Sequence, residues 1–428
     1  MPDRLGQLRK ELQLQDYTAL SAELKKIWSN LSQGERARLE PMIRTSHADL
    51  VRIRDCGVVQ EQPMRELLLT YSLLHDDPNG LLSDTSTPEA VATSVGPDGQ
   101  VYFGNVDYDS TDPGWAYVFV AWYGTEGQAP PFSDKPATIE IPSTVTITLL
   151  GDWGGKNTAA HEIARNVDPS DLIIHLGDVY YAGTNVNGLV ERDYQQGNFL
   201  TPWPGKKEQS FALNSNHDMY ARGTGYFKTT LASPTFQHQN GCSYFALYNG
   251  SFRIVGLDTA YFDQDASATG YMIGTLGPTG PGTQAQFLHN QAQAAAAARQ
   301  TLILLTHHNG LLYDGSGATP LWGEVLAQLT PLSGDRVIWY WGHEHMGVIY
   351  TDRTANGITI SPRCCGHSCI PWGIATGLNT SGVAWYEQTV RGPGTNYFVS
   401  NGYARLAIDE SSIGETFYRQ DGSQSWRK

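Results

Sequence analysis

The sequence has no long hydrophobic run and few cysteines. The longest apolar run, Trp115–Tyr123, is far shorter than the roughly 20 residues of a membrane-spanning helix. The first residues also lack the basic stretch followed by an apolar one that marks a signal peptide, so neither a span nor a leader is predicted. Five cysteines in 428 residues are too few for a disulfide-based secreted scaffold. We therefore expect a cytoplasmic protein that is not inserted in a membrane.

Positive charge is also scarce. The chain has 29 Lys and Arg against 43 Asp and Glu, which gives a formal net charge of −14. This balance argues against a protein that coats nucleic acid by neutralising phosphates, and it favours a small molecule as partner. Disorder as the main state is excluded, because 40% hydrophobic and 11% aromatic residues supply a sizeable core. None of these quantities sets the oligomeric state.

Three segments follow one another along the chain. Residues 1–90 show apolar side chains at helical spacing, which predicts about three or four short helices. Residues 91–143 contain two runs typical of strands, Gln100–Val106 and Trp115–Tyr123, which predict a small β segment. Residues 144–428 form the third segment. The first two segments could have any of three roles: packing against the third segment, dimerisation, or gating of substrate access.

The third segment alternates between buried apolar strands and amphipathic helices, the pattern of an α/β fold. Gln284–Arg299, rich in Ala and Gln, is a predicted helix, and the Gly-rich loops Asp263–Gly282 and Gly373–Gly394 are expected at the rim. The strands suit sheets covered on both faces, whose carboxyl ends carry the chemistry. The predicted strands are Thr144–Leu150, Asp171–His175, Phe252–Val255, Thr301–Thr306 and Val337–Trp341.

Clusters of polar residues follow the predicted strands. Each cluster alone is a weak signal, because a Gly-Asp pair or a lone His after a strand is usually structural. Together they supply carboxylate, amide and imidazole donors, which match divalent or trivalent metal ions. The five clusters are Gly151–Gly154, Gly177–Tyr181, Asn216–Asp218, His307–His308 and Gly342–His345.

The ordered series resembles the calcineurin-like metallophosphoesterase superfamily over about residues 145–410. Its motifs run Asp-x-Gly, Gly-Asp-x-x-Tyr, Asn-His-Asp, His and Gly-His-x-His. Gly154, two places after Asp152, and Tyr181, three places after Asp178, resemble the purple acid phosphatase variant. The resemblance implies a catalytic domain over residues 144–428, built as a sandwich of two mixed β-sheets flanked by helices.

The resemblance also implies which side chains hold two metal ions. One ion would be held by Asp152, Asp178, Tyr181 and His345, and the other by Asp178, Asn216, His307 and His343. Asp178 is then the bridge between the ions. A phenolate such as Tyr181 favours Fe(III), paired with Fe(II), Zn(II) or Mn(II). Two divalent ions would leave less positive charge to attract a phosphate.

The chemistry of such a centre predicts hydrolysis of phosphate esters. Two metals clamp the attacking and departing oxygens and generate a hydroxide nucleophile near neutral pH. His217, next to Asn216, is predicted to protonate the leaving alkoxide, with Asp218 orienting it; the alternative is a structural His217. Two other functions stay open: a phosphodiesterase acting on cyclic nucleotides or other diesters, and a metal-containing binding or regulatory module without turnover.

Three further polar residues are candidates for substrate contact. Arg363 and His367 follow the Gly-His-x-His strand, so they are predicted to contact phosphate oxygens, and His308 is a candidate because it adjoins His307. Asp258, after the strand Phe252–Val255, either supports the site through hydrogen bonds or forms a simple turn.

Thiols and aromatic rings near these motifs allow more than one interpretation. Cys364, Cys365 and Cys369 are open to three interpretations: zinc ligands, a disulfide, or buried free thiols. Trp153, Tyr180 and Trp372 could stack on an aryl or nucleoside group, although such rings more often belong to the core.

Overall fold

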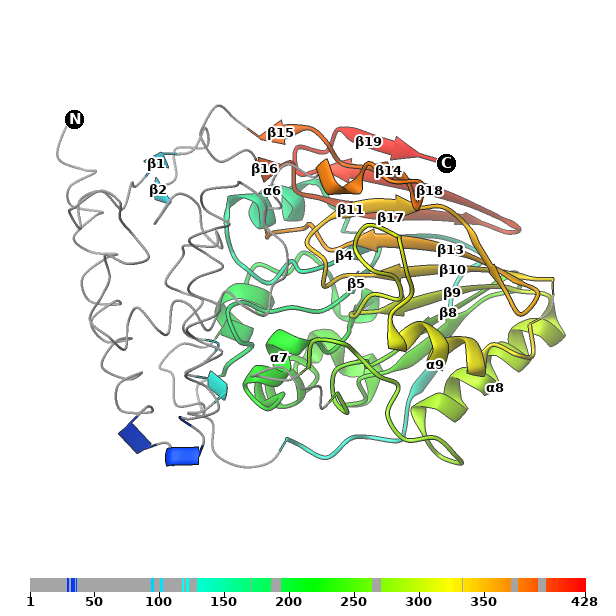
Figure 1. Ribbon diagram of the computed structural model, residues 1–428, viewed down its shortest axis with the longest axis horizontal. Helices are drawn as coiled ribbons and strands as arrows, with labels where there is room; N and C mark the ends of the chain where they lie inside the picture. Colours follow the sequence, from blue (N-terminus) through cyan, green and yellow to red (C-terminus); the bar gives the residue numbers. More distant parts are fainter. Residues whose placement is uncertain are drawn as a thin grey trace.

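Two β-sheets stacked face to face form the framework of the described chain (Figure 1). The computed structural model describes residues 129–428 except 170, 186–193, 264–270, 333, 371–375 and 392–397. It also describes residues 29–30, 32–34, 36, 94–95, 101–102, 118 and 121–122. Most of the helical and β segments expected in residues 1–143 therefore lie outside the described residues.

The extended run expected at Trp115–Tyr123 is wrong at its described residues. Val118, Ala121 and Trp122 are helical. Their spacing of three and four places them on one face of a helix, and Val118 and Ala121 are buried in the core of the domain that follows. Burial of this face accounts for a helix where the apolar composition alone suggested a strand.

The larger sheet has nine strands. Its order is β14-β11-β13-β10-β9-β8-β7-β3, with β12 paired to β13. Strands β8, β9, β10 and β13 form a parallel group. β7 pairs antiparallel with β8, β11 and β12 pair antiparallel with β13, and β14 pairs antiparallel with β11. β3 pairs parallel with β7 at the edge of the sheet. The strands are β3 (Ala137–Glu140), β7 (Phe245–Tyr248), β8 (Phe252–Gly256), β9 (Thr301–Thr306), β10 (Arg336–Trp341), β11 (Gly347–Tyr350), β12 (Arg353–Ala355), β13 (Ile358–Cys365) and β14 (Val383–Tyr386).

The smaller sheet has six strands, in the order β19-β18-β17-β4-β5-β6. Its β4, β5 and β6 are parallel, and β17, β18 and β19 continue it antiparallel. The strands are β4 (Thr144–Leu150), β5 (Leu172–His175), β6 (Ser210–Ala212), β17 (Gly402–Asp409), β18 (Ser412–Arg419) and β19 (Gln424–Arg427). Two separate antiparallel pairs are β1 (Ser94–Val95) with β2 (Val101–Tyr102), and β15 (Val390–Arg391) with β16 (Phe398–Val399).

Apolar side chains between the sheets hold the sandwich together. Leu149 and Ile174 of the smaller sheet share one buried cluster with Ile303 and Ile338 of the larger sheet. Because side chains alternate along a strand, the residues between them point to the outer faces, which must be covered as well. Both sheets are therefore buried on two sides at their centres, which explains the nearly continuous apolar runs in these strands.

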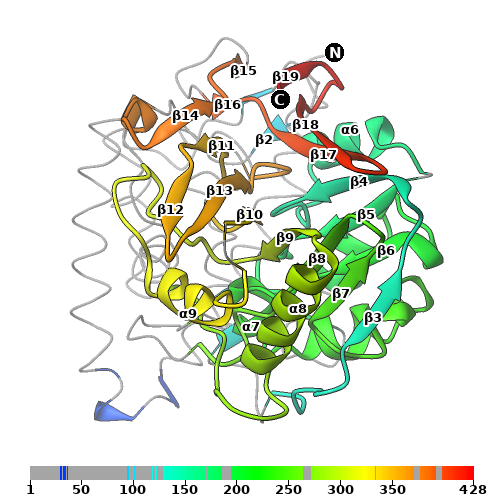
Figure 2. The ribbon, with the colours of Figure 1, turned by 90° about the vertical axis from the view of Figure 1, so that its right-hand side faces the viewer.

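Helices cover the outer faces. Figure 2 shows α8 (Gln284–Ala298) and α9 (Pro320–Gln328) lying along the larger sheet, where they share a second buried cluster with its strands. On the smaller sheet, α6 (Thr158–Asn166) packs against β17. The other described helices are α7 (Asn216–Tyr220), η4 (Gln195–Leu200), η5 (Lys207–Gln209), η6 (Tyr226–Thr230), η7 (Pro234–Gln239) and η8 (Thr376–Leu378).

The predicted fold class is confirmed: the chain is a mixed α/β protein with two mixed sheets. β4 and β9 have the predicted bounds, and α8 ends one residue before the predicted Arg299. Ala137–Glu140, expected in the small β segment, instead joins the edge of the larger sheet as β3. Within the described part of the chain, no helix combines the length and hydropathy needed to cross a membrane.

Candidate metal centre

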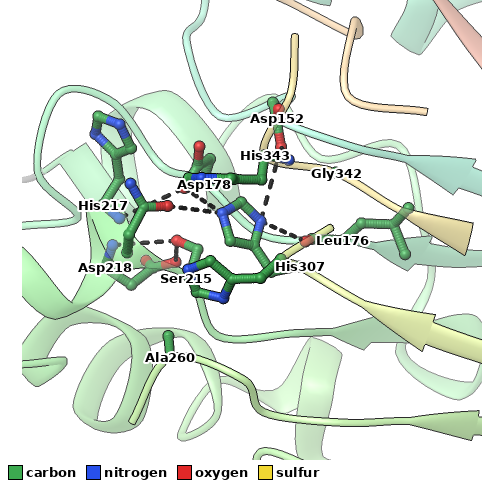
Figure 3. Close-up of polar contacts among 12 residues, drawn as sticks. Asp152, Leu176, Asp178, Ser215, His217, Asp218, Ala260, His307, Gly342 and His343 are labelled. Atoms are coloured by element: carbon green, nitrogen blue, oxygen red, sulfur yellow. Dashed lines mark hydrogen bonds and ion pairs between the residues drawn. The ribbon is translucent and has the colours of Figure 1, made fainter. Parts of the chain in front are cut away.

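The polar clusters at the ends of four strands meet at one edge of the sandwich (Figure 3). β4 leads into Asp152, β5 into Asp178, β9 into His307 and β10 into His343. The backbone N–H of Asp152 donates to the carbonyl of Gly177 at 3.0 Å, which joins the first two of these strand ends. Side chains distant in sequence are thus fixed next to one another, as the sheet architecture predicts.

Three of these residues have left-handed backbone conformations. The φ angles are 57° at Asp152, 75° at Asp178 and 62° at His343. Such conformations cost on the order of 1–3 kcal/mol each for a non-glycine residue, so the surrounding contacts must enforce them. Gly177, at φ 106°, has no alternative: a Cβ there would lie 2.5 Å from Nδ1 of His307. The Gly-Asp motif therefore lets the imidazole approach the strand end.

Asp152, Asp178 and His345 form the first group of candidate ligands. Each offers one donor atom, and these atoms lie within 4.8 Å of one another. Oδ2 of Asp152 is buried and, among the described residues, has no hydrogen-bond partner. Burial, followed by the neighbouring charge of Asp178, raises the pKa of Asp152 well above its ordinary value. A cation between the two carboxylates would offset both the cost of burying the Asp152 charge and its repulsion by Asp178.

The phenol that reaches this group is that of Tyr180. Its hydroxyl donates to Oδ2 of Asp178 at 2.7 Å and lies 2.9 Å from Nε2 of His345. The ring of Tyr181, the predicted ligand, instead packs edge-on against Tyr194 at 5.9 Å between centroids. The structure therefore places the Tyr180 hydroxyl beside Asp178 and His345, so Tyr180 becomes a candidate ligand alongside the predicted Tyr181.

Asp178, Asn216 and His307 bring three donor atoms together in the second group. Nε2 of His307 lies 2.7 Å from Oδ1 of Asn216 and 3.2 Å from Oδ1 of Asp178. Nδ1 of His307 lies 2.9 Å from the carbonyl of Leu176, which can only accept, so Nδ1 carries the proton and Nε2 presents a lone pair. Protonating Nε2 is opposed because burial lowers the pKa of His307 well below its ordinary value. Three lone pairs facing one another without a proton are the arrangement that a cation stabilises.

His343 and His308 complete the surroundings of His307. The three imidazoles can present ligand atoms within 4.8 Å of one another. Nδ1 of His343 is buried and has no hydrogen-bond partner among the described residues, which suits a metal ligand. Both ring nitrogens of His308 have partners, the hydroxyl of Thr259 at 2.8 Å and the carbonyl of Tyr271 at 2.7 Å. His308 is therefore not free for the predicted contact with substrate.

His217, the predicted acid, lies at the start of α7 and is buried. Its Nδ1 contacts the carbonyl of Tyr181 at 2.5 Å, so Nδ1 carries a proton and the second proton of the acid form would be carried by Nε2. Burial lowers the pKa of His217. Asp218 does not orient the ring as predicted: its carboxylate accepts from Ser215 at 2.5 Å and from Gln195, and in Figure 3 it points away from His217. Burial raises the pKa of Asp218 to about 8.

Arg363 does not face the centre, so its predicted role in phosphate binding is wrong. It lies between the sheets, where its Nε donates to Oε2 of Glu415 at 3.0 Å and its guanidinium lies 5.9 Å from the ring of Trp426. Tyr340 donates to the same carboxylate at 2.7 Å. Glu415 on β18 is fully buried and needs this cation, which explains why Arg363 points into the sandwich.

His367 is also drawn away from phosphate. Its ring stacks on Phe417 at 6.1 Å, and Nε2 is so close to Gly347 and Gly402 that a Cβ at either glycine would lie within 2.7 Å. Burial lowers the pKa of His367 to about 4, against an opposing effect of Glu387, so the ring is neutral at pH 7. A buried neutral imidazole packed on glycines offers no charge to a phosphate, and this prediction is wrong as well.

The three clustered thiols belong to different parts of the core. Cys364, Cys365 and Cys369 are free and buried, and each lies in a separate apolar cluster. Neighbouring residues of a strand point to opposite faces, so Cys364 and Cys365 cannot converge on one ion or bond to each other. The interpretation as buried free thiols is confirmed, and those as zinc ligands and as a disulfide are wrong.

Asp258 has both of the roles considered for it. Its Oδ1 accepts from the backbone N–H groups of Ala260 and Tyr261, which forms a turn after β8. Both carboxylate oxygens also lie 3.1 Å from Nδ2 of Asn214, two residues before the candidate ligand Asn216. The turn thus supports the loop that leads into the centre.

The residues present fit two metal ions. Buried carboxylates lie side by side, a histidine lone pair faces oxygens, and two buried donor atoms have no hydrogen-bond partner among the described residues: Oδ2 of Asp152 and Nδ1 of His343. Asp178 contributes to both groups through different oxygens. Carboxylate, imidazole and amide donors suit Fe, Mn and Zn.

The sequence reasoning considered Tyr180 only as a stacking ring and missed its contacts with Asp178 and His345, and it missed two residues that contact Asn216. Nδ2 of Asn216 donates to the hydroxyl of Tyr220 at 3.0 Å and to Sδ of Met272 at 3.4 Å. The spacing of four between Asn216 and Tyr220 in a helix was a usable signal. Met272 lies in a Gly-rich loop and had none.

The fold and the donor groups together define a sandwich domain with a candidate metal centre. Residues 145–347 match the protein family described as calcineurin-like phosphoesterase. This segment contains both donor groups, so the centre lies within the part of the chain that is similar to this family. No curated protein matches the chain at a significant level.

Several solved structures are similar to this chain at low sequence identity. GAP50, the anchor in the inner membrane complex of Plasmodium, is 12% identical with a TM-score of 0.46, over 67% of this chain and 88% of that one. A dimetal phosphatase from Danio rerio is 13% identical with a TM-score of 0.41, over 68% and 98%. A predicted phosphoesterase from Streptococcus pneumoniae is 14% identical with a TM-score of 0.27, over 67% and 98%.

Proposed function

We propose that this chain hydrolyses small phosphate esters with two metal ions held at the strand-end centre. The observation that carries the proposal is the position of Asp178. Its Oδ1 lies 3.2 Å from Nε2 of His307, and its Oδ2 accepts from the Tyr180 hydroxyl, which also lies 2.9 Å from Nε2 of His345. A single buried carboxylate shared by two donor groups is what a dinuclear centre requires. The match of residues 145–347 to the phosphoesterase family supports the same reaction class.

The chain's own residues would divide the work of the reaction. Two ions bound here would polarise the phosphoryl oxygens and activate water for an in-line displacement. Leu176 fixes the tautomer of His307, so that Nε2 faces the centre. His217, held through Nδ1 by the Tyr181 carbonyl, would give a proton from Nε2 to the leaving oxygen. Because burial lowers its pKa, this acid form is favoured at acidic pH.

We propose Fe(III) for the ion near Tyr180, with Fe(II), Zn(II) or Mn(II) as its partner. Burial and the charge of Asp178 raise the pKa of Tyr180 well above 10, so the hydroxyl keeps its proton without metal. A trivalent cation beside Asp178 would reverse this effect and stabilise the phenolate. The phenol is well placed for it, 2.7 Å from Asp178 and 2.9 Å from His345.

A substrate panel tests the reaction class. Metal-free protein would be reloaded with Fe, Zn or Mn, and its metal content measured next to its rates on nitrophenyl phosphate monoesters, diesters and triesters. We expect hydrolysis that needs metal and that is lost in Asp178→Asn. The ratio of monoester to diester rates would decide between a phosphatase and a phosphodiesterase. Protein that binds two ions and hydrolyses none of these esters would instead be a regulatory or binding module.

A further inference from the structure

A short segment of the loop after β8 lies against the second donor group. We call residues 271–276 the strap. Oδ2 of Asp263 accepts from the backbone N–H groups of Ile273 and Gly274 at 2.9 and 2.7 Å. On the other side, Glu324 of α9 accepts from the backbone N–H of Leu276 at 2.7 Å. Two buried or half-buried carboxylates therefore fix the backbone of the strap.

Tyr271, the first residue of the strap, contacts both the segment that precedes the domain and a histidine of the centre. The ring of Tyr271 packs edge-on against Trp122, from the segment that precedes the domain, at 5.5 Å between centroids. The guanidinium of Arg222 lies 3.8 Å from the centre of the Trp122 ring. The carbonyl of Tyr271 lies 2.7 Å from Nε2 of His308. The strap is thereby held between the preceding segment and the histidines of the centre.

Met272 of the strap contacts a candidate metal ligand. Its Sδ lies 2.9 Å from the hydroxyl oxygen of Tyr220 and 3.4 Å from Nδ2 of Asn216. The same Nδ2 lies 3.0 Å from the Tyr220 oxygen. Asn216 and Tyr220 are fully buried, so water does not compete for these contacts.

The direction of these hydrogen bonds follows from the thioether. A thioether sulfur has lone pairs and no hydrogen, so it can only accept. The Tyr220 hydroxyl must then donate to Met272, which leaves its own lone pairs for an incoming donor. The NH2 end of the Asn216 amide donates to these lone pairs and also faces the sulfur of Met272. Turning the amide over would put Oδ1 against the lone pairs of the Met272 sulfur in a buried site, where the NH2 group now donates.

We propose that Met272 and Tyr220 are positioning residues that select which end of the Asn216 amide faces the metal. Because the two ends of an amide have nearly the same shape, packing alone cannot choose between them. Only the oxygen end binds a cation, and Oδ1 is the atom that lies 2.7 Å from Nε2 of His307. The inference rests on the proposed function, since it assumes that a metal ion binds at this group.

Metal affinity is the direct test. Met272→Leu keeps the apolar volume and removes the acceptor, and Tyr220→Phe keeps the ring that packs on His217 at 4.9 Å. Loss of a group that orients a ligand typically costs about 10–100-fold in metal affinity. We expect a weakening of this size for one of the two ions in each variant, measured by competition with a chelator. Ile273→Ala, at an exposed neighbour in the strap, is the matched control and should bind as the wild type does.

A second background separates orientation from general damage to the loop. In Asn216→Asp both ends of the side chain are oxygens, so its orientation no longer decides ligation. Met272→Leu should therefore cost much less in the Asn216→Asp background than in the wild type. Thermal unfolding in the presence of chelator would check that each variant folds.

The possible outcomes are distinct from those of the proposed function. The inference is overturned if Met272→Leu and Tyr220→Phe bind both ions as tightly as Ile273→Ala does, or if Met272→Leu costs the same with Asp at position 216. Hydrolysis by the wild type would in those cases still support the proposed function. If the wild type binds no metal at all, the proposed function fails and this inference fails with it.

Discussion

Changing Asp178 to asparagine should shift stability in opposite directions with and without metal. The substitution keeps the shape of the side chain but removes its charge and converts one oxygen to an NH2 group, which cannot bind a cation. Oδ1 of Asp178 lies 3.2 Å from Nε2 of His307, and Oδ2 accepts from Tyr180 at 2.7 Å. Each oxygen therefore faces a different half of the centre.

The magnitudes follow from these contacts. In the metal-free chain, burial and the charge of Asp178 raise the pKa of Asp152, so Asp178→Asn relieves a repulsion and should raise the melting temperature. In the metal-loaded chain, loss of a ligand should weaken metal affinity by at least about 100-fold, because loss of a group that only orients a ligand already weakens metal affinity by about 10–100-fold. A factor of 100 corresponds to about 2.7 kcal/mol per ion at saturating metal. The metal-loaded variant should therefore melt roughly 5–10 °C below the wild type.

Thermal unfolding followed by circular dichroism, in excess metal and in chelator, would measure both shifts. Asp171→Asn is the matched control, because Asp171 is a buried carboxylate paired with Arg405 at 2.9 Å outside the centre. It should lower the melting temperature by a similar amount in both media. If Asp178→Asn behaves in the same way as this control, or loses one ion while keeping full affinity for the other, the bridging role of Asp178 is refuted.

Three other predictions concern the neighbours of the ligands. Iron-loaded protein should show a visible phenolate-to-iron absorption band that Tyr180→Phe removes and Tyr181→Phe keeps; the reverse result would restore the ligand predicted from the sequence. His217→Ala should slow hydrolysis of alkyl phosphates about 10²–10⁴-fold more than hydrolysis of nitrophenyl phosphate. In the wild type, the part of the alkyl phosphate rate that depends on His217 should fall as the pH rises through a pKa below 6.5. Equal slowing of both esters in His217→Ala would exclude the acid role. The folded-state pKa of Asp218 is raised from 3.8 to about 8, so the folded state binds the proton more tightly and its stability should fall between pH 4 and 8. Asp218→Asn should flatten that slope in chemical unfolding curves, and an unchanged slope would assign it to other groups.

The sequence predicted the strands and the ligand-bearing edge because both depend on local pattern. Runs such as Thr144–Leu150 and Thr301–Thr306 are rich in Leu, Ile and Val and are buried toward their carboxyl ends, since both faces of each central strand are covered there. The residues that follow them lie at the carboxyl ends of parallel strands, so their meeting follows from the topology alone. The structure brings together the predicted ligands Asp152, Asp178 and His307 for this reason.

The residues that were placed wrongly depend on contacts that no local pattern encodes. Arg363 lies within β13, beside β10, but the buried carboxylate of Glu415 in the other sheet draws its side chain between the sheets. Tyr180 and Tyr181 are adjacent and chemically alike, so only the path of the loop decides which one reaches Asp178. Met272 meets Asn216 across 56 positions, from a loop with no periodicity.

The central claim is that two ions at this centre are required for hydrolysis, and a metal titration tests it most directly. Metal-free protein would receive known equivalents of Fe, Zn or Mn, and the rate of nitrophenyl phosphate hydrolysis would be followed together with bound metal. The account predicts almost no rate without metal and a rise that reaches its plateau at two bound ions per chain. Full activity in chelator, or a plateau at one bound ion, would contradict it.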